Sequence, residues 1–110
     1  MSVLITVVES MLNAQTESER SVAEHRVIET LTFSNFQEIV SMLNNFLDEN
    51  LLILPPWTRN LSYRLACFLA PNDSEIRRIA AADLLVVGPD WDDEAGRLFK
   101  EAEEIEAKAQ

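Results

Sequence analysis

The clearest structural signal in the chain is the segment SNFQEIVSMLNNFLDEN at residues 34–50. Apolar side chains recur in it every three or four positions, which is the spacing of one face of an α-helix. Ser34 and Gln37 fit a capping box, in which the two side chains accept hydrogen bonds from free backbone N–H groups at the helix start. We therefore predict a helix that ends near Asn50 and buries Phe36, Ile39, Val40, Leu43, Phe46 and Leu47.

Proline, asparagine and glycine mark further helix boundaries downstream of this segment. Proline is favoured in the first helical turn, where its missing N–H would have no partner anyway, so Pro55-Pro56 predicts a helix over 56–69. Asn72 or Asp73 can cap a helix over 74–87, and Gly88 is placed for a left-handed cap at its end. The residues expected to point inward from the 56–69 helix are Trp57, Leu61, Leu65, Phe68 and Leu69.

The two ends of the chain also carry helical patterns. A helix over 91–108 is predicted by a heptad-like seam. A helix over 17–31 is predicted by its apolar side, and residues 3–14 carry the same kind of stripe, although β-branched residues leave a strand open for 3–8. The seam of the 91–108 helix consists of Trp91, Ala95, Leu98, Ala102 and Ile105. The stripe of residues 3–14 consists of Val3, Leu4, Val7, Val8, Met11 and Leu12. The apolar side of the 17–31 helix consists of Val22, Ala23, Val27, Ile28 and Leu31.

These segments together predict an all-α fold. Only 2 of the 110 residues are glycine, whereas strand-rich folds use glycine in many turns. A chain of this length is expected to form one domain over residues 1–110. We expect a compact bundle of about five helices arranged as helical hairpins, or a short helical-repeat array.

The repeat alternative depends on an internal similarity at an offset of 34 residues, the length of a helix–turn–helix repeat. Residues 49–57 read ENLLILPPW and residues 83–91 read DLLVVGPDW, so Pro55 aligns with Pro89 and Trp57 with Trp91. Apolar positions of the two following helices also align, including Phe68 with Ala102. Residues 95–102 resemble the second helix of a tetratricopeptide repeat, but Ile79 occupies the position of that consensus tryptophan and no proline closes the unit.

Composition narrows the classes of function. The chain has 19 acidic and 9 basic residues, a net charge of −10, and this charge disfavours binding to nucleic acid or to an anionic membrane surface. Residues 1–9 lack the basic region of a signal peptide, and no stretch of about 18 apolar residues predicts a membrane span. The single cysteine, Cys67, is expected to be a buried thiol, which fits a reducing cytoplasm.

The densest cluster of charge is formed by Asp90, Asp92, Asp93 and Glu94. These acids are interpreted as a helix cap with first-turn carboxylates, as an acidic contact surface, or as part of a metal site. No second carboxylate group or histidine has the spacing to complete a metal site, and His25 stands alone. Glu101, Glu103, Glu104 and Glu106 are interpreted as a solvated helix face or a partner surface.

The aromatic residues suggest where a partner would bind. Trp57 and Trp91 follow proline-marked helix starts, where tryptophan either fills the core or acts as a binding hot spot. Tyr63 and Arg59 lie four residues apart and suggest a polar contact face. We predict no catalytic, cofactor-binding or metal-binding residue, and therefore no enzyme. The predicted partner-binding residues are Trp57, Asp90, Trp91, Asp92, Asp93 and Glu94.

In size, acidity and lack of a catalytic motif, the chain resembles the small immunity proteins of bacterial toxin systems, including those of contact-dependent growth inhibition. The resemblance implies a cytoplasmic protein that binds one cognate toxin, often a basic nuclease, and covers its active site with acidic side chains. It carries no shared motif, so it identifies no residue. The alternative is a structural or adaptor helical-repeat module, or a homo-oligomer subunit that docks a peptide or a second copy.

Overall fold

The computed structural model describes residues 3–49 and 54–109, and within these ranges it is all-α, as predicted. No strand occurs in the described residues, and the segment at 3–8 that was open between strand and helix is helical. Residues 3–49 and 54–109 form six α-helices, one more than the five or so expected. The elements are α1 (Val3–Leu12), α2 (Glu17–Thr32), α3 (Phe36–Glu49), α4 (Pro56–Leu69), α5 (Ser74–Val87), the short 3₁₀ turn η2 (Pro89–Trp91) and α6 (Asp92–Lys108).

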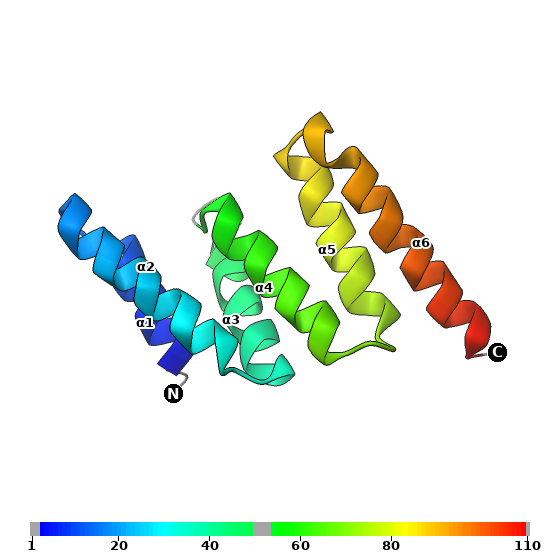
Figure 1. Ribbon diagram of the computed structural model, residues 1–110, viewed down its shortest axis with the longest axis horizontal. Helices are drawn as coiled ribbons and strands as arrows, with labels where there is room; N and C mark the ends of the chain where they lie inside the picture. The colour runs from blue at the N-terminus through cyan, green and yellow to red at the C-terminus, as the bar shows by residue number, and fades with distance from the viewer. Residues whose placement is uncertain (1–2, 50–53, 110) are drawn as a thin grey trace. The chain divides into compact units, whose positions relative to one another are not determined.

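The chain divides into two compact units, Met1–Leu65 and Ala66–Gln110, with the division inside α4. In the first unit, α1 packs against α2 and α3 (Figure 1). Its core consists of apolar residues from these three helices, but the predicted inward sides are only partly correct. Val3, Val22 and Ile28 are exposed and Phe36 and Val40 are half-buried, whereas Met42 is completely buried without having been predicted. The prediction of a single domain over 1–110 stays a prediction. The core residues are Leu4, Val8, Met11, Val27, Leu31, Ile39, Met42, Leu43 and Phe46.

The second unit contains an antiparallel hairpin of α5 and α6, which η2 joins at one end (Figure 1). The predicted seam of α6 is confirmed at Ala95, Leu98 and Ala102, which are buried. Ile105 is only half-buried, and Trp91, also half-buried, precedes α6. Alanine also predominates on the buried side of α5, where Ala80 and Ala81 lie. Small side chains at such positions let two helices approach closely.

The capping box between α2 and α3 lies one residue later than predicted. The backbone N–H of Asn35 donates to Glu38 Oε1 at 2.9 Å, and the N–H of Glu38 donates to Asn35 Oδ1 at 2.8 Å. Ser34 instead belongs to the end of α2, where its hydroxyl donates to the Thr30 carbonyl at 2.7 Å. The Ser34–Gln37 assignment is therefore wrong, since the serine hydroxyl is already used by the preceding helix. The predicted end at Asn50 lies outside the described residues.

The boundaries of α5 are close to those predicted. Asp73 Oδ1 accepts a hydrogen bond from the N–H of Ile76 at 3.0 Å, so Asp73 is the N-cap. Gly88 ends the helix with φ 142° and ψ 171°, which is not the left-handed helical cap that we expected. This backbone conformation is essentially restricted to glycine. A glycine is therefore required at position 88, although for a different geometry.

The buried face of α4 differs from the predicted one. Thr58, Ser62 and Ala66 are completely buried at intervals of four residues, whereas Phe68 is 80% exposed and Leu69 is also exposed. The prediction that Phe68 and Leu69 point inward is therefore wrong, and Trp57, Leu61 and Leu65 are only half-buried. The Ser62 hydroxyl donates to the Thr58 carbonyl at 2.7 Å, which allows a serine to be buried with its hydroxyl paired.

Candidate protein-binding site

The predicted acidic cluster forms a corner between α5 and α6, which we call the acidic corner and define as Asp90–Glu94. Gly88 turns the chain out of α5, and the N–H of Trp91 then donates to the Gly88 carbonyl at 3.2 Å. The N–H of Asp92 donates to the carbonyl of Pro89, which completes the 3₁₀ turn before α6 begins. The structure thus places five of the six predicted partner-binding residues within two short turns.

Three carboxylates of the acidic corner are exposed and unpaired. The side chains of Asp90, Asp92 and Asp93 have no hydrogen bond or ion pair with any residue that the structure describes. The N-cap of α6 is Trp91, with no capping side-chain hydrogen bond, so no acid caps this helix. Asp92 and Asp93 do lie in the first turn of α6, where the helix dipole favours negative charge. The interpretation as first-turn acids is confirmed, and the interpretation as a cap is wrong.

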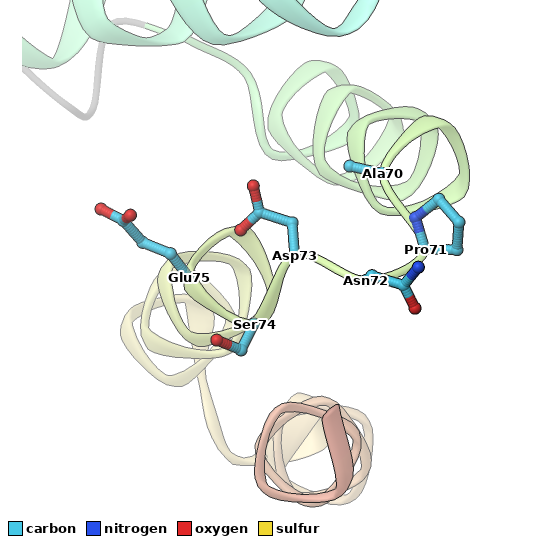
Figure 2. Close-up of a pocket in the computed structure, with 6 residues that line it drawn as sticks. All are labelled: Ala70, Pro71, Asn72, Asp73, Ser74 and Glu75. Atoms are coloured by element: carbon cyan, nitrogen blue, oxygen red, sulfur yellow. The ribbon is translucent and has the colours of Figure 1, made fainter. Parts of the chain in front are cut away.

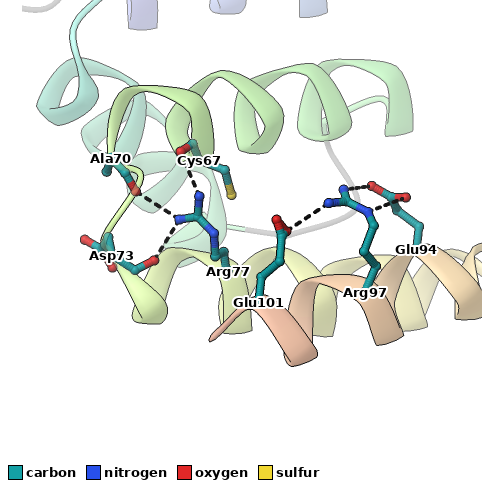
Figure 3. Close-up of polar contacts among 7 residues, drawn as sticks. All are labelled: Cys67, Ala70, Asp73, Arg77, Glu94, Arg97 and Glu101. Carbon is teal, nitrogen blue, oxygen red and sulfur yellow. Dashed lines mark hydrogen bonds and ion pairs between the residues drawn. The ribbon is translucent and has the colours of Figure 1, made fainter. Parts of the chain in front are cut away.

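The fourth carboxylate is paired along α6. Arg97 donates hydrogen bonds to both oxygens of Glu94 and to Glu101 Oε2, the latter at 2.9 Å (Figure 3). The hydrogen bond to Glu94 raises the pKa of the Arg97 guanidinium. Because Arg97 is shared by two carboxylates, Glu94 is held in place and partly neutralised. The uncompensated negative charge of the corner is concentrated on its three aspartates.

The two tryptophans are both half-buried, but they belong to different units. Trp91 is the last residue of η2, next to the free aspartates, and Trp57 is the second residue of α4 in the first unit. Each lies at a helix start, and neither is in the middle of a helix or in a strand. Only Trp91 is placed by the structure in the acidic corner.

The 34-residue similarity extends to the backbone turns and not to the helix faces. The N–H of Thr58 donates to the Pro55 carbonyl, just as the N–H of Asp92 donates to that of Pro89. Phe68 is exposed, however, whereas the aligned Ala102 is completely buried. The predicted match of apolar positions is therefore wrong at this pair. Residues 50–53 of the first copy lie outside the described residues.

Arg77 organises the turn between α4 and α5. Arg77 is buried, with 8% of its surface exposed. Its guanidinium donates hydrogen bonds to three backbone carbonyls (Figure 3). The acceptors are Ala70 at 2.9 Å, Asp73 at 3.0 Å and Cys67 at 3.1 Å. The bonds to Cys67 and Ala70 satisfy carbonyls at the end of α4, where a cation is also favoured by the helix dipole. An open hollow beside this turn is lined by Ala70, Pro71, Asn72, Asp73, Ser74 and Glu75 (Figure 2).

Sequence reasoning missed Arg77 as a buried residue and misplaced two others. Tyr63 and Arg59 were expected to form a polar contact face, but both are buried. Asp83 of α5 is buried as well. Only the regular spacing of Thr58, Ser62 and Ala66 hinted that this side of α4 is the covered one.

The remaining reactive side chains do not form a cluster. Cys67 is half-buried, and burial raises the pKa of its thiol, an effect that the positive charge of Arg77 opposes. His25 is exposed, and its Nδ1–H donates to the Ser21 carbonyl at 2.9 Å. Among the described residues, no group of three or more His, Cys, Asp or Glu side chains has the arrangement to hold a metal ion.

Comparison with known proteins places the chain in no family. No family model, no curated protein and no solved structure matches it. Over residues 3–49 and 54–109, no helix has both the length and the apolar character needed to cross a membrane. The acidic corner and the distribution of charge are therefore the observations on which a function can be proposed.

Proposed function

We propose that this chain is a non-catalytic protein-binding domain that uses the acidic corner to bind a basic protein surface. The observation that carries the proposal is the set of three exposed, unpaired aspartates at a rigid helix start, in a chain with a net charge of −10. Carboxylates held in this way form a fixed negative field. Such a field speeds encounter with a basic partner and disfavours an acidic one.

The corner also contains an apolar group that can prolong the complex. Trp91 is half-buried beside the aspartates, so part of its indole is available to a partner. Tryptophan is enriched among the residues that dominate binding energy, whereas charges at the rim of an interface mainly set the association rate. We therefore assign the encounter to Asp90, Asp92 and Asp93, and part of the lifetime of the complex to Trp91.

Neutralisation of a basic toxin is the form of this activity that we propose, as in the immunity proteins that the chain resembles. The acidic corner would cover a basic active site and exclude its anionic substrate. The alternative of a helical-repeat adaptor requires two equivalent Pro-x-Trp units, and the opposite burial of Phe68 and Ala102 argues against it. The alternative of a homo-oligomer is disfavoured by charge, because it brings together two chains that each carry a net charge of −10 and repel each other.

The test compares two variants of equal net charge. Asp90→Asn, Asp92→Asn and Asp93→Asn are combined in one variant. A matched control removes three exposed carboxylates of the first unit through Glu9→Gln, Glu17→Gln and Glu29→Gln. The partner is isolated by affinity capture from the native lysate, and its association rate is measured by stopped flow from low to physiological salt.

We expect the aspartate variant to slow association at low salt by about tenfold and to flatten its salt dependence, with a smaller effect of the control. Equal effects of the two variants would show that net charge acts and the corner does not. A captured partner that is itself acidic would contradict the proposal.

A further inference from the structure

Helix α5 has apolar side chains on two sides, although four of its 14 residues are charged. One side is buried and includes Ile76, Ala80 and Leu84. The opposite side is exposed to solvent over its last two turns, where Val86 is 61% exposed and Leu85 is 49% exposed. We call this side the α5 apolar face and define it by four exposed residues, which are Ile79, Ala82, Leu85 and Val86.

An exposed apolar face of this kind indicates contact with another molecule. Aliphatic side chains that stay uncovered do not gain the free energy of burial, so an exposed group of them on one side of a helix is a candidate contact. Contiguous apolar patches are rare on monomeric proteins and mark interaction sites. Ile79 and Val86 lie seven residues apart, which is two helical turns or about 10 Å. This length matches two turns of a helix laid against it.

The α5 apolar face adjoins the acidic corner. Val86 precedes Asp90 by four residues, and η2, which carries Asp90, packs against both α5 and α6. The end of α5, with Leu85 and Val86, and the free aspartates therefore lie at the same end of the hairpin, where η2 joins α5 to α6 (Figure 1). A surface that combined them would have an apolar centre and a negatively charged edge.

Charge determines which occupant fits this surface. The unit Ala66–Gln110 contains eleven acidic and five basic residues, a net charge of −6, so a second copy would meet strong repulsion. A basic amphipathic helix has the opposite features. Its apolar side would cover Ile79, Leu85 and Val86, and its cationic residues would reach Asp90, Asp92 and Asp93.

We infer that the α5 apolar face and the acidic corner form one docking surface for a basic amphipathic helix of the partner protein. This inference rests on the proposed function and names the element of the partner that is bound. The apolar side chains and the charges have separate roles in binding, as they do in other complexes in which a helix lies on an apolar surface. Removal of the anchors should therefore weaken binding by faster dissociation, and removal of the aspartates by slower association.

The experiment uses a synthetic amphipathic helix of leucine and lysine, with a second peptide in which glutamate replaces lysine. Each is titrated into the ¹⁵N-labelled full chain and followed by NMR. We expect the lysine peptide alone to bind, with shifts at the end of α5, in η2 and in the first turn of α6. The double variant Leu85→Ser and Val86→Ser should weaken binding about tenfold or more.

Val22→Ser is the matched control, because Val22 of α2 is 60% exposed, as Val86 is, and lies in the other unit. It should bind the lysine peptide as the unchanged chain does. Ala82→Lys is a second variant that keeps a good helix former at an exposed position and places a repelling charge in the middle of the face. It should also abolish most of the binding, so the inference is tested even if the serine variant unfolds.

The outcomes separate this inference from the proposed function. If the aspartate variant loses binding while the α5 variants retain it, the inference is overturned and the function stands. If the lysine peptide binds neither surface, and the aspartate variant still associates normally with the captured partner, both fall. If sedimentation shows a dimer that the serine variant abolishes, the occupant is a second copy and the inference is overturned.

Discussion

Replacement of Arg77 by alanine should destabilise the second unit far more than replacement of its neighbour Arg78. Arg77 is buried and donates to three backbone carbonyls, those of Cys67, Ala70 and Asp73. Arg78 pairs only with Glu106, and both of these side chains are more than 40% exposed. The two substitutions thus remove the same side chain from adjacent positions of one helix.

The size of the effect follows from the hydrogen bonds. A bond from a charged donor contributes about 1.5–3 kcal/mol, but three bonds of one guanidinium are not additive, and carbonyls left in an exposed turn regain water. We therefore expect Arg77→Ala to lower the free energy of unfolding by about 2–4 kcal/mol. Arg77→Lys should lose about half of this, since an ammonium keeps the charge without the planar fork. Exposed ion pairs contribute little, so Arg78→Ala should change stability only slightly.

The assay is urea unfolding followed by the fluorescence of Trp91. Trp57→Phe is introduced in every variant, so that the signal comes from the second unit alone. With an m-value of about 1–3 kcal/mol/M, the midpoint for Arg77→Ala should fall by about 0.7–4 M. If Arg77→Ala and Arg78→Ala shift the midpoint equally, the three carbonyl bonds do not stabilise the α4–α5 turn and the reasoning is refuted.

Three further predictions concern the local structure. Gly88→Ala should cost about 1–3 kcal/mol through backbone strain alone, since an added Cβ meets no atom within 4 Å. Gly96→Ala in α6 should instead stabilise the chain by about 0.5–1 kcal/mol. Thermal melts check both, because the melting temperature should fall for the first variant and rise for the second. Asn35→Ala should cost about 0.5–2 kcal/mol and Gln37→Ala little in urea titrations, and the reverse order would restore the original capping assignment. Because burial raises the pKa of Cys67, alkylation of its thiol by iodoacetamide should accelerate at higher pH in the native chain than in urea, and coincident pH profiles would contradict this.

Helix boundaries were predictable because the signals that set them act locally. Pro56, Asp73 and Gly88 each act through the backbone of their own turn, so a reader of the sequence can place a boundary within a residue or two. The capping box shows the limit of this approach. Ser34 and Asn35 both have the chemistry of a cap, and only the bond from Ser34 to the preceding helix determines which of them is used.

The buried side of α4 could not be predicted from hydropathy. Hydropathy favours Phe68 over Thr58 for the core, yet the small residues at Thr58, Ser62 and Ala66 are the buried ones. Arg77 was missed for the same reason, since an arginine looks like a solvent-exposed residue until its acceptors are known. The acceptors of Arg77 lie four to ten residues before it, across the α4–α5 turn, so its burial depends on the geometry of that turn and not on hydropathy.

The residues of the candidate site could be predicted from the sequence, but not which of its carboxylates are unpaired. The chain itself makes Asp90–Glu94 contiguous, so their proximity needs no structure. Their availability does need one, since Arg97 pairs with Glu94 and leaves the three aspartates free. The α5 apolar face was also missed, because only the two ends of the 74–87 helix were predicted and no apolar side was assigned to it.

The turn between α2 and α3 has a consequence for how the chain folds. Its hydrogen bonds join Ser34 to Thr30 and to Leu31, and Asn35 to Glu38, so none spans more than four residues. Contacts this short have almost no loop-closure entropy to overcome and form on the timescale of helix growth. During synthesis, this corner can be complete as soon as Glu38 has left the ribosome, before any residue of α4 has emerged. The helices made later therefore fold after the α2–α3 turn has set the direction in which the chain continues.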